Sequence, residues 1–162
     1  MPTPADTTLL LDVMLGKLAT YLRMCGYDTA YALDRGIEAD SKLRKLAIEE
    51  DRTLLTRDID LARQADETVV LRGLVIEAQL SELNEVGFSL VLDTPTRCSV
   101  CNGQLSRVRI NETTPSFAPS PTEQAVWRCH ECGQLFWKGS HWQDVEMTLA
   151  GLETERETYR CD

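Results

Sequence analysis

Two Cys-x-x-Cys pairs constrain the fold of this chain more than any other feature. They are Cys98–Cys101 and Cys129–Cys132, separated by 27 residues. Four soft thiolates at this spacing are the ligand set that surrounds one tetrahedral zinc ion, and the pattern is typical of a zinc ribbon. A glycine just past the knuckle permits positive φ, so that backbone amides can point at the sulfurs. Because four ligands leave no coordination position open, we expect this zinc to build structure.

The alternatives to zinc are two disulfides or a dithiol redox pair. Disulfides need an oxidising compartment. The N-terminal segment lacks the basic and apolar stretches of a secretory signal, and no run of 18 apolar residues is present that could span a membrane. We therefore expect a cytoplasmic protein with reduced thiols and no membrane partner. Of the remaining cysteines, Cys25 lies in an apolar helical pattern and is expected in the core, whereas Cys161 lies in a polar tail.

The charge is unevenly distributed. The chain carries −9 overall, yet residues 97–141 carry five basic and three acidic side chains, which leaves −11 for the rest. An acidic surface suits a saline cytoplasm or docking on a basic protein partner. A zinc ion held by four thiolates would carry −2, which makes the ribbon about neutral, but its basic side chains could still face one side and contact RNA, and we name Arg107, Arg109 and Lys138 as candidate contacts.

Strand and helix patterns alternate over the first part of the chain. Strands are expected at 7–11, 27–31, 52–56, 68–71 and 88–92, and helices at 14–25, 41–50, 61–65 and 75–86. Asp40 or Ser41 would cap the second helix. This alternation predicts an α/β fold with a parallel sheet. We expect this domain to cover 7–93, a ribbon with a hairpin around its second knuckle to cover 96–142, and a C-terminal helix to about 152 followed by a frayed polar tail within 143–162.

Carboxylates recur where the expected strands end. Asp12 follows the first strand, Asp34, Glu38 and Asp40 follow the second, and Asp58 and Asp60 follow the third. Ligands of parallel sheets bind at this edge, and oxygen ligands suit Mg²⁺ or Mn²⁺, which activate water toward phosphorus. For each single aspartate, capping a helix is the alternative role. As a set, they predict metal-dependent phosphodiester hydrolysis.

Several motifs together resemble a known family. They are 11–19, 22–28, Leu-Leu-Thr-Arg-Asp at 54–58, both knuckles, and 136–142. In combination and order they resemble the PIN-like ribonuclease domain of the Mut-seven C-terminal type, which ends in a zinc ribbon. The resemblance covers roughly 8–150.

The resemblance implies a PIN-like sheet flanked by helices, a Mg²⁺- or Mn²⁺-dependent ribonuclease site, and a ribbon that helps to hold RNA, with tRNA, rRNA or the ribosome as candidate forms. It assigns metal-binding acids to Asp12 and Asp58, with Asp34 or Asp40 as the middle acid and Asp60 as a fourth ligand. Lys17 and Arg57, beside these acids, would contact phosphate.

Two classes of function stay open. One is a metal-dependent ribonuclease, and the other is a non-catalytic RNA- or ribosome-binding adaptor with the same fold. Among the ribbon side chains, His130 is expected to face solvent or RNA, and His141 to cap or pack at a helix start. Phe136, Trp127, Trp137 and Trp142 are expected as a small core, although one or two could instead stack on bases.

Overall fold

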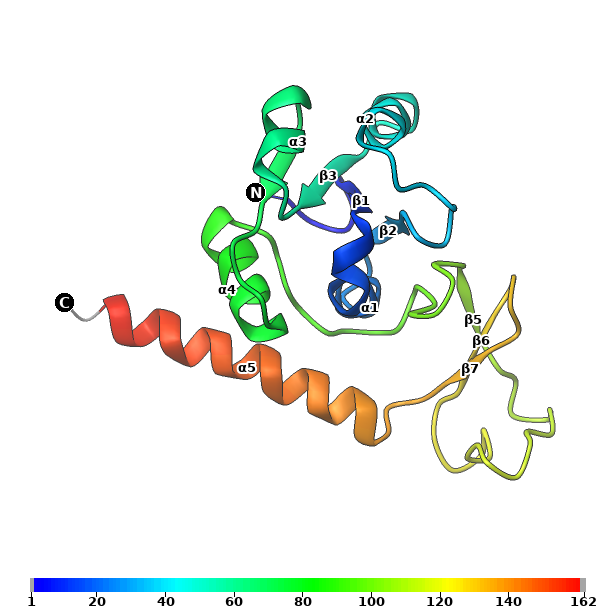
Figure 1. Ribbon diagram of the computed structural model, residues 1–162. Helices are drawn as coiled ribbons and strands as arrows, with labels where there is room; N and C mark the ends of the chain where they lie inside the picture. The colour runs from blue at the N-terminus through cyan, green and yellow to red at the C-terminus, as the bar shows by residue number, and fades with distance from the viewer. Residues whose placement is uncertain (1, 161–162) are drawn as a thin grey trace.

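The main sheet is parallel and has four strands, as the sequence predicts. The structure is a computed structural model that describes the backbone of residues 2–160 and the side chains of residues 2–152. The strands pair in the order β2-β1-β3-β4 (Figure 1). Their bounds are β1 (Thr8–Leu11), β2 (Asp28–Tyr31), β3 (Thr53–Thr56) and β4 (Thr68–Val70).

Helices cover both faces of this sheet because its strands alternate between two apolar cores. Leu9 and Leu11 of β1 pack on the side of α1 (Gly16–Met24), α4 (Ile76–Val86) and α5 (Ser140–Arg160). Leu10 packs on the opposite side, against α2 (Asp40–Glu49) and α3 (Ile59–Gln64). Successive side chains of a strand point to opposite faces, so an unbroken leucine run serves both cores. A short 3-10 helix, η1 (Val13–Leu15), leads from β1 into α1. The predicted α/β fold is confirmed.

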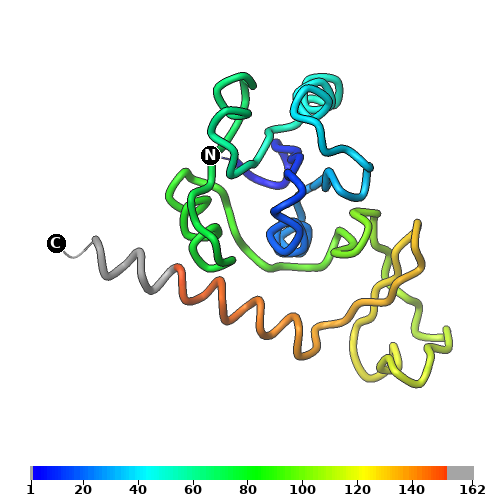
Figure 2. Tube along the Cα trace, in the orientation of Figure 1, coloured from blue at the N-terminus to red at the C-terminus, as the bar shows by residue number. Residues whose placement is uncertain are grey.

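The second sheet is small and antiparallel. It contains β5 (Leu105–Arg107), β6 (Trp127–Cys129) and β7 (Leu135–Phe136) in that order, and the expected hairpin around the second knuckle is β6–β7. Figure 2 shows the chain leaving α4, running beneath α1 to reach this sheet, and returning along α5 to α4. The four cysteines cluster here, as predicted. None of the helices in the described part of the chain combines the length and apolar character needed to cross a bilayer.

Three expectations about elements are wrong. No strand forms at 88–92, because Ser89 donates its amide to Pro2 O, and Tyr27 donates its hydroxyl to Ser89 O. The last helix does not end at 152 but runs to Arg160, through a stretch without glycine or proline after Gly151. The cap of α2 is Ala39, without a side-chain hydrogen bond, and Asp40 is the first helical residue. Cys161 lies outside the described residues.

Candidate functional site

The four cysteine sulfurs already stand at the spacing of a tetrahedral zinc site. All four lie within 4.8 Å of one another, with Cys98–Cys132 at 3.7 Å and Cys101–Cys129 at 3.4 Å. Four sulfurs bound tetrahedrally at about 2.3 Å from zinc would be separated by about 3.8 Å. Thiolates are the ligands that zinc prefers in closed structural sites. The donor set therefore fits one structural zinc ion.

Backbone geometry supports the same site. Amides donate to the sulfurs, from Cys101 to Cys98 Sγ and from Glu131 and Cys132 to Cys129 Sγ. Burial raises the pKa of Cys129, but these amides outweigh it and bring that pKa down to about 7. Amides that donate to a ligand sulfur orient it and stabilise its thiolate form.

Positive φ occurs right after each knuckle, but glycine provides it only once. In the second knuckle Gly133 has φ 75°, as predicted, whereas in the first knuckle Asn102 has φ 72°. Gly103 has another role, because a Cβ there would lie 2.7 Å from Cys129 Sγ and 3.2 Å from Cys101 Sγ. Because the glycine of the first knuckle is at 103, the position with positive φ carries a side chain, that of Asn102.

That side chain attaches the ribbon to the edge of the main sheet. Asn102 Oδ1 accepts the amide of Thr29 at 2.9 Å, and Asn102 Nδ2 donates to Asp28 Oδ1 at 2.7 Å. Thr29 belongs to the edge strand β2 and is fully buried, so its amide needs this partner. Burial raises the pKa of Asp28, but hydrogen bonds from Asn102 and Arg52 outweigh it and hold that pKa below its usual value.

A buried arginine makes the second attachment. Arg23 of α1 is only 4% exposed, and it donates to the carbonyls of Ser99 and Val100 inside the first knuckle. It also donates through Nε to Thr29 O, and through Nη2 to Asp34 at 3.3 Å. One guanidinium thus ties helix, strand and knuckle together. Neither Arg23 nor Asn102 was singled out from the sequence, although an arginine inside the apolar pattern of α1 was a visible signal.

Two of the predicted acids follow β1 and β3, the neighbouring strands between which the strand order of the sheet reverses. The chain moves from β1 to β2 on one side, then returns across to β3 and β4 on the other. α1 covers one face and α2 the opposite face, so the connections diverge between β1 and β3. Asp12 follows β1 and Asp58 follows β3. In open α/β sheets this switch point is where ligands bind.

The hydroxyl of Thr56 connects these two acids. Thr56 Oγ1 donates to Asp12 Oδ2 at 2.7 Å and accepts the amide of Asp58 at 3.0 Å. Asp12 Oδ1 also accepts the amide of Val13, and its side chain is buried. Asp58 caps α3, since its Oδ1 accepts the amides of Asp60 and Leu61, while no described residue donates to its Oδ2. Both acids therefore have fixed orientations at the carboxyl edge.

The other predicted acids lie further out on the surface. Asp34, half exposed, is paired with Arg23. Asp40 and Asp60 are exposed in the first turns of α2 and α3. Across the described side chains, the four cysteines are the one group of three or more His, Cys, Asp or Glu side chains placed to share a metal ion. The assignment of a third acidic ligand thus stays a prediction.

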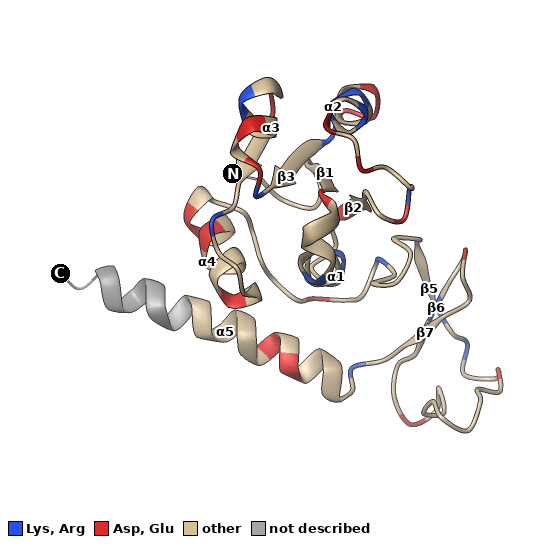
Figure 3. Ribbon diagram, viewed as in Figure 1, with Lys and Arg blue, Asp and Glu red and all other residues tan. Residues whose placement is uncertain are grey.

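The predicted RNA contacts occupy two regions. Lys17 is exposed on α1, and Arg57 is half-buried beside Asp58 with its Nε buried and unpaired among the described atoms. Arg107 and Arg109 are exposed on the ribbon, and Lys138 lies 5.2 Å above the ring of Trp142. Figure 3 shows acidic and basic positions mixed in the main domain, and basic positions together with acidic ones in the ribbon.

The aromatic and histidine side chains of the ribbon and the start of α5 differ in their exposure. Trp127 and Trp142 are buried, while Phe136 and Trp137 are only partly covered. His130 is exposed and contacts the hydroxyl of Ser106. His141 is exposed in the first turn of α5.

Comparison with known proteins gives a match to a family model. No curated protein and no solved structure matches the chain significantly. The family model described as "Mut7-C RNAse domain" matches residues 7–149, which is most of the chain and includes both sheets and the four cysteines. The chain belongs to the Mut7-C RNAse domain family.

Proposed function

We propose that the protein is a divalent-metal-dependent ribonuclease whose metal is held at the carboxyl edge of the main sheet. The observation that carries this proposal is that Thr56 Oγ1, at the switch point, donates to the Asp12 carboxylate and accepts the backbone amide of Asp58. Membership of an RNAse domain family supports the same activity. The zinc ribbon would hold RNA, and the four thiolates leave its zinc no open position for catalysis.

Two acids at fixed positions are enough to begin such a site. Magnesium is usually held by one or two carboxylates, with waters and substrate phosphates completing its six ligands. Asp12 and Asp58 would supply those carboxylates, and Asp34 or Asp40 would be the middle acid. Carboxylates repel one another until a cation neutralises them, so a third acid would join only in the loaded enzyme. The metal would supply a bound water of lowered pKa and charge stabilisation at phosphorus.

The residues around these acids have distinct roles in this proposal. Thr56 holds Asp12 Oδ2, so that the carboxylate keeps one orientation. Arg57, half-buried beside Asp58, would donate to a phosphate oxygen through its guanidinium, a group well suited to that contact. Lys17 on α1 would attract the RNA backbone from the other side of Asp12. Asp60 would be a further ligand in the first turn of α3.

One observation favours the non-catalytic alternative. Within the described side chains, no three aspartates are placed to share a metal ion. A protein that binds RNA or a ribosome without cleaving it would need only the fold and the ribbon. The same assay separates the two functions.

The experiment compares cleavage and binding of labelled total RNA. Zinc-loaded wild type is incubated with Mg²⁺, with Mn²⁺ or without either ion, beside Asp12→Asn and Asp58→Asn. The matched control is Asp66→Asn, since Asp66 is exposed just before β4, at the opposite edge of the sheet. We expect metal-dependent cleavage by wild type and Asp66→Asn, and a loss of at least 100-fold in the other two. Binding without cleavage by every protein would select the adaptor.

A further inference from the structure

We propose that a cleft between α1 and the zinc ribbon holds one or two unpaired bases of single-stranded RNA. This inference rests on the proposed function only in taking RNA as the ligand. The cleft has a volume of about 590 Å³, within the range of small-molecule sites. Residues from α1, the first knuckle, β7 and the start of α5 line it. Asp12 and Asp58 do not line it, so it is separate from the candidate metal site.

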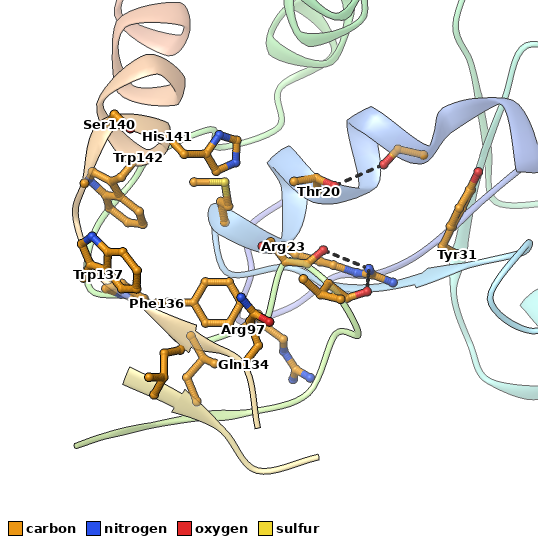
Figure 4. Close-up of a pocket in the computed structure, with 18 of the residues that line it drawn as sticks. Thr20, Arg23, Tyr31, Arg97, Gln134, Phe136, Trp137, Ser140, His141 and Trp142 are labelled. Carbon is orange, nitrogen blue, oxygen red and sulfur yellow. Dashed lines mark hydrogen bonds between the residues drawn. The ribbon is translucent and has the colours of Figure 1, made fainter. Parts of the chain in front are cut away.

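Aromatic rings dominate one wall of the cleft. Figure 4 shows Phe136, Trp137 and Trp142 on the side of β7 and α5, facing Thr20 and Arg23 of α1. Phe136 and Trp137 are partly exposed and line the cleft, although Trp137 also packs against the ribbon core, so part of each ring is open to a ligand. Bases stack on such rings without regard to sequence, because every base has a π-face. A flat apolar wall of this kind suits an unpaired base and excludes a base pair buried in a helix.

Polar groups around the rings match the edges of a base. Gln134, Ser140 and His141 line the cleft and are exposed, and no hydrogen bond engages their side chains within the described structure. An amide, a hydroxyl and an imidazole offer both donors and acceptors. These groups would hydrogen-bond the base edges that pairing leaves free in single-stranded RNA.

Charge at the cleft favours a polyanion over an apolar peptide. Lys138 lies over the ring of Trp142 beside the cleft, and Arg97 lines the cleft while its Nη2 lies 3.9 Å from Asp28 Oδ2. The acid that lines it, Asp34, is paired with the buried Arg23. The chain as a whole is strongly acidic, whereas the ribbon segment 97–141 carries five basic and three acidic side chains, so that with a zinc tetrathiolate of charge −2 it is about neutral. Cations gathered beside an aromatic wall are the combination by which proteins bind single strands.

The cleft also leads toward the candidate metal site. Gly16 and Tyr31 line it, and Tyr31 donates its hydroxyl to the carbonyl of Val13, the residue next to Asp12. A Cβ at position 16 would lie 2.9 Å from Tyr31 Oη, so glycine allows this close contact. An RNA strand whose bases lie in the cleft would therefore reach Asp12 along α1.

The test measures RNA affinity without cleavage. All proteins carry Asp58→Asn and are zinc-loaded in buffer without Mg²⁺, Mn²⁺ or chelator. Fluorescence anisotropy follows a labelled ten-nucleotide single strand of mixed sequence, and the same strand annealed to its complement. Phe136→Leu and Trp137→Leu remove the stacking faces while keeping apolar volume. The control is Phe117→Leu, since Phe117 is 69% exposed on the ribbon and does not line the cleft. Zinc content and circular dichroism confirm that each variant is folded.

We expect each cleft variant to weaken single-strand binding about tenfold or more, with Phe117→Leu unchanged and duplex binding weak throughout. Equal affinities for cleft and control variants would overturn the inference, as would tighter binding of the duplex. The inference would also be overturned if the parent protein is a dimer and the cleft variants are monomers, since a second copy would then occupy the cleft. If the protein with Asp58 intact cleaves no RNA when Mg²⁺ or Mn²⁺ is added, the proposed nuclease is refuted, whereas this binding result still stands.

Discussion

Truncating Asn102 should remove one of the two attachments between the zinc ribbon and the main domain, at a predictable cost in stability. In Asn102→Ala the buried amide of Thr29 loses its acceptor, which costs about 1–3 kcal/mol. The hydrogen bond to Asp28 is also lost, worth about 1 kcal/mol because that carboxylate is partly exposed. Alanine at φ 72° adds about 1 kcal/mol of backbone strain. The free energy of unfolding should fall by about 4 kcal/mol in total.

The assay is urea unfolding of zinc-loaded protein, followed by tryptophan fluorescence and by circular dichroism. The tryptophans lie in the ribbon and the start of α5, whereas most of the helices surround the main sheet. Asn102→Gly is the control, because glycine accepts positive φ and loses only the hydrogen bonds, so its loss should be about 1 kcal/mol smaller. Zinc content should stay at one ion per chain in each variant, since residue 102 is not a ligand.

Two results would refute this reasoning. If Asn102→Gly unfolds within about 0.5 kcal/mol of wild type, the contacts with Thr29 and Asp28 contribute no stability. If zinc content drops in the variants, the effect arises inside the knuckle and not at the sheet edge.

Three further predictions follow from the thiols and from Asp28. Chelating zinc should change tryptophan fluorescence reversibly. Zinc affinity should also rise with pH, because burial raises the pKa of Cys98 to about 12 and the thiols must lose their protons to bind. Competition with a chromophoric chelator across pH measures this affinity, and an affinity that does not change with pH would contradict the prediction. Asp28→Asn should be less stable than wild type at pH 7, and the difference should shrink as pH falls below about 4. The pKa of Asp28 is lower in the folded than in the unfolded protein, so its carboxylate stabilises the fold above the unfolded pKa, and acid removes that stability. Urea titrations across pH test this, and a constant difference in stability would count against it. Cys25 should resist iodoacetamide in the native state and react in urea, because burial raises its pKa to about 12; peptide mapping by mass spectrometry detects the adduct, and rapid native labelling would disprove the assignment.

Much of the fold follows from local patterns in the sequence. Leu9–Leu11 lies in a run of leucines too short for a helix and bounded by polar residues, which predicts a strand buried on both faces. Gly87 ends α4 with φ 110°, as a glycine after an apolar helical pattern predicts. The segment 88–92 shows where such patterns fail. It has the apolar content of a strand, but Tyr27 and Pro2 supply its hydrogen bonds, and these partners lie far away in the sequence.

The site also has parts that local sequence patterns predict and parts that depend on distant contacts. Cysteine spacing is a local signal that contains the whole zinc site, so Cys98, Cys101, Cys129 and Cys132 could be identified directly. The positions of Asp12 and Asp58 after strands could also be predicted, because strand ends are visible in sequence. The Thr56 hydroxyl between them could not, since it depends on the register of β1 against β3. The cleft is still less visible, because it forms only where the ribbon meets α1.

Manganese binding tests the central claim most directly, because it needs no knowledge of the RNA substrate. Zinc-loaded wild type, Asp12→Asn, Asp58→Asn and Asp66→Asn are titrated with Mn²⁺, and electron paramagnetic resonance measures the free ion. We predict one or two bound ions in wild type and Asp66→Asn, with affinity at least tenfold weaker in the variants at the carboxyl edge. Equal binding by all four proteins, or none by wild type, would contradict a metal centre between β1 and β3.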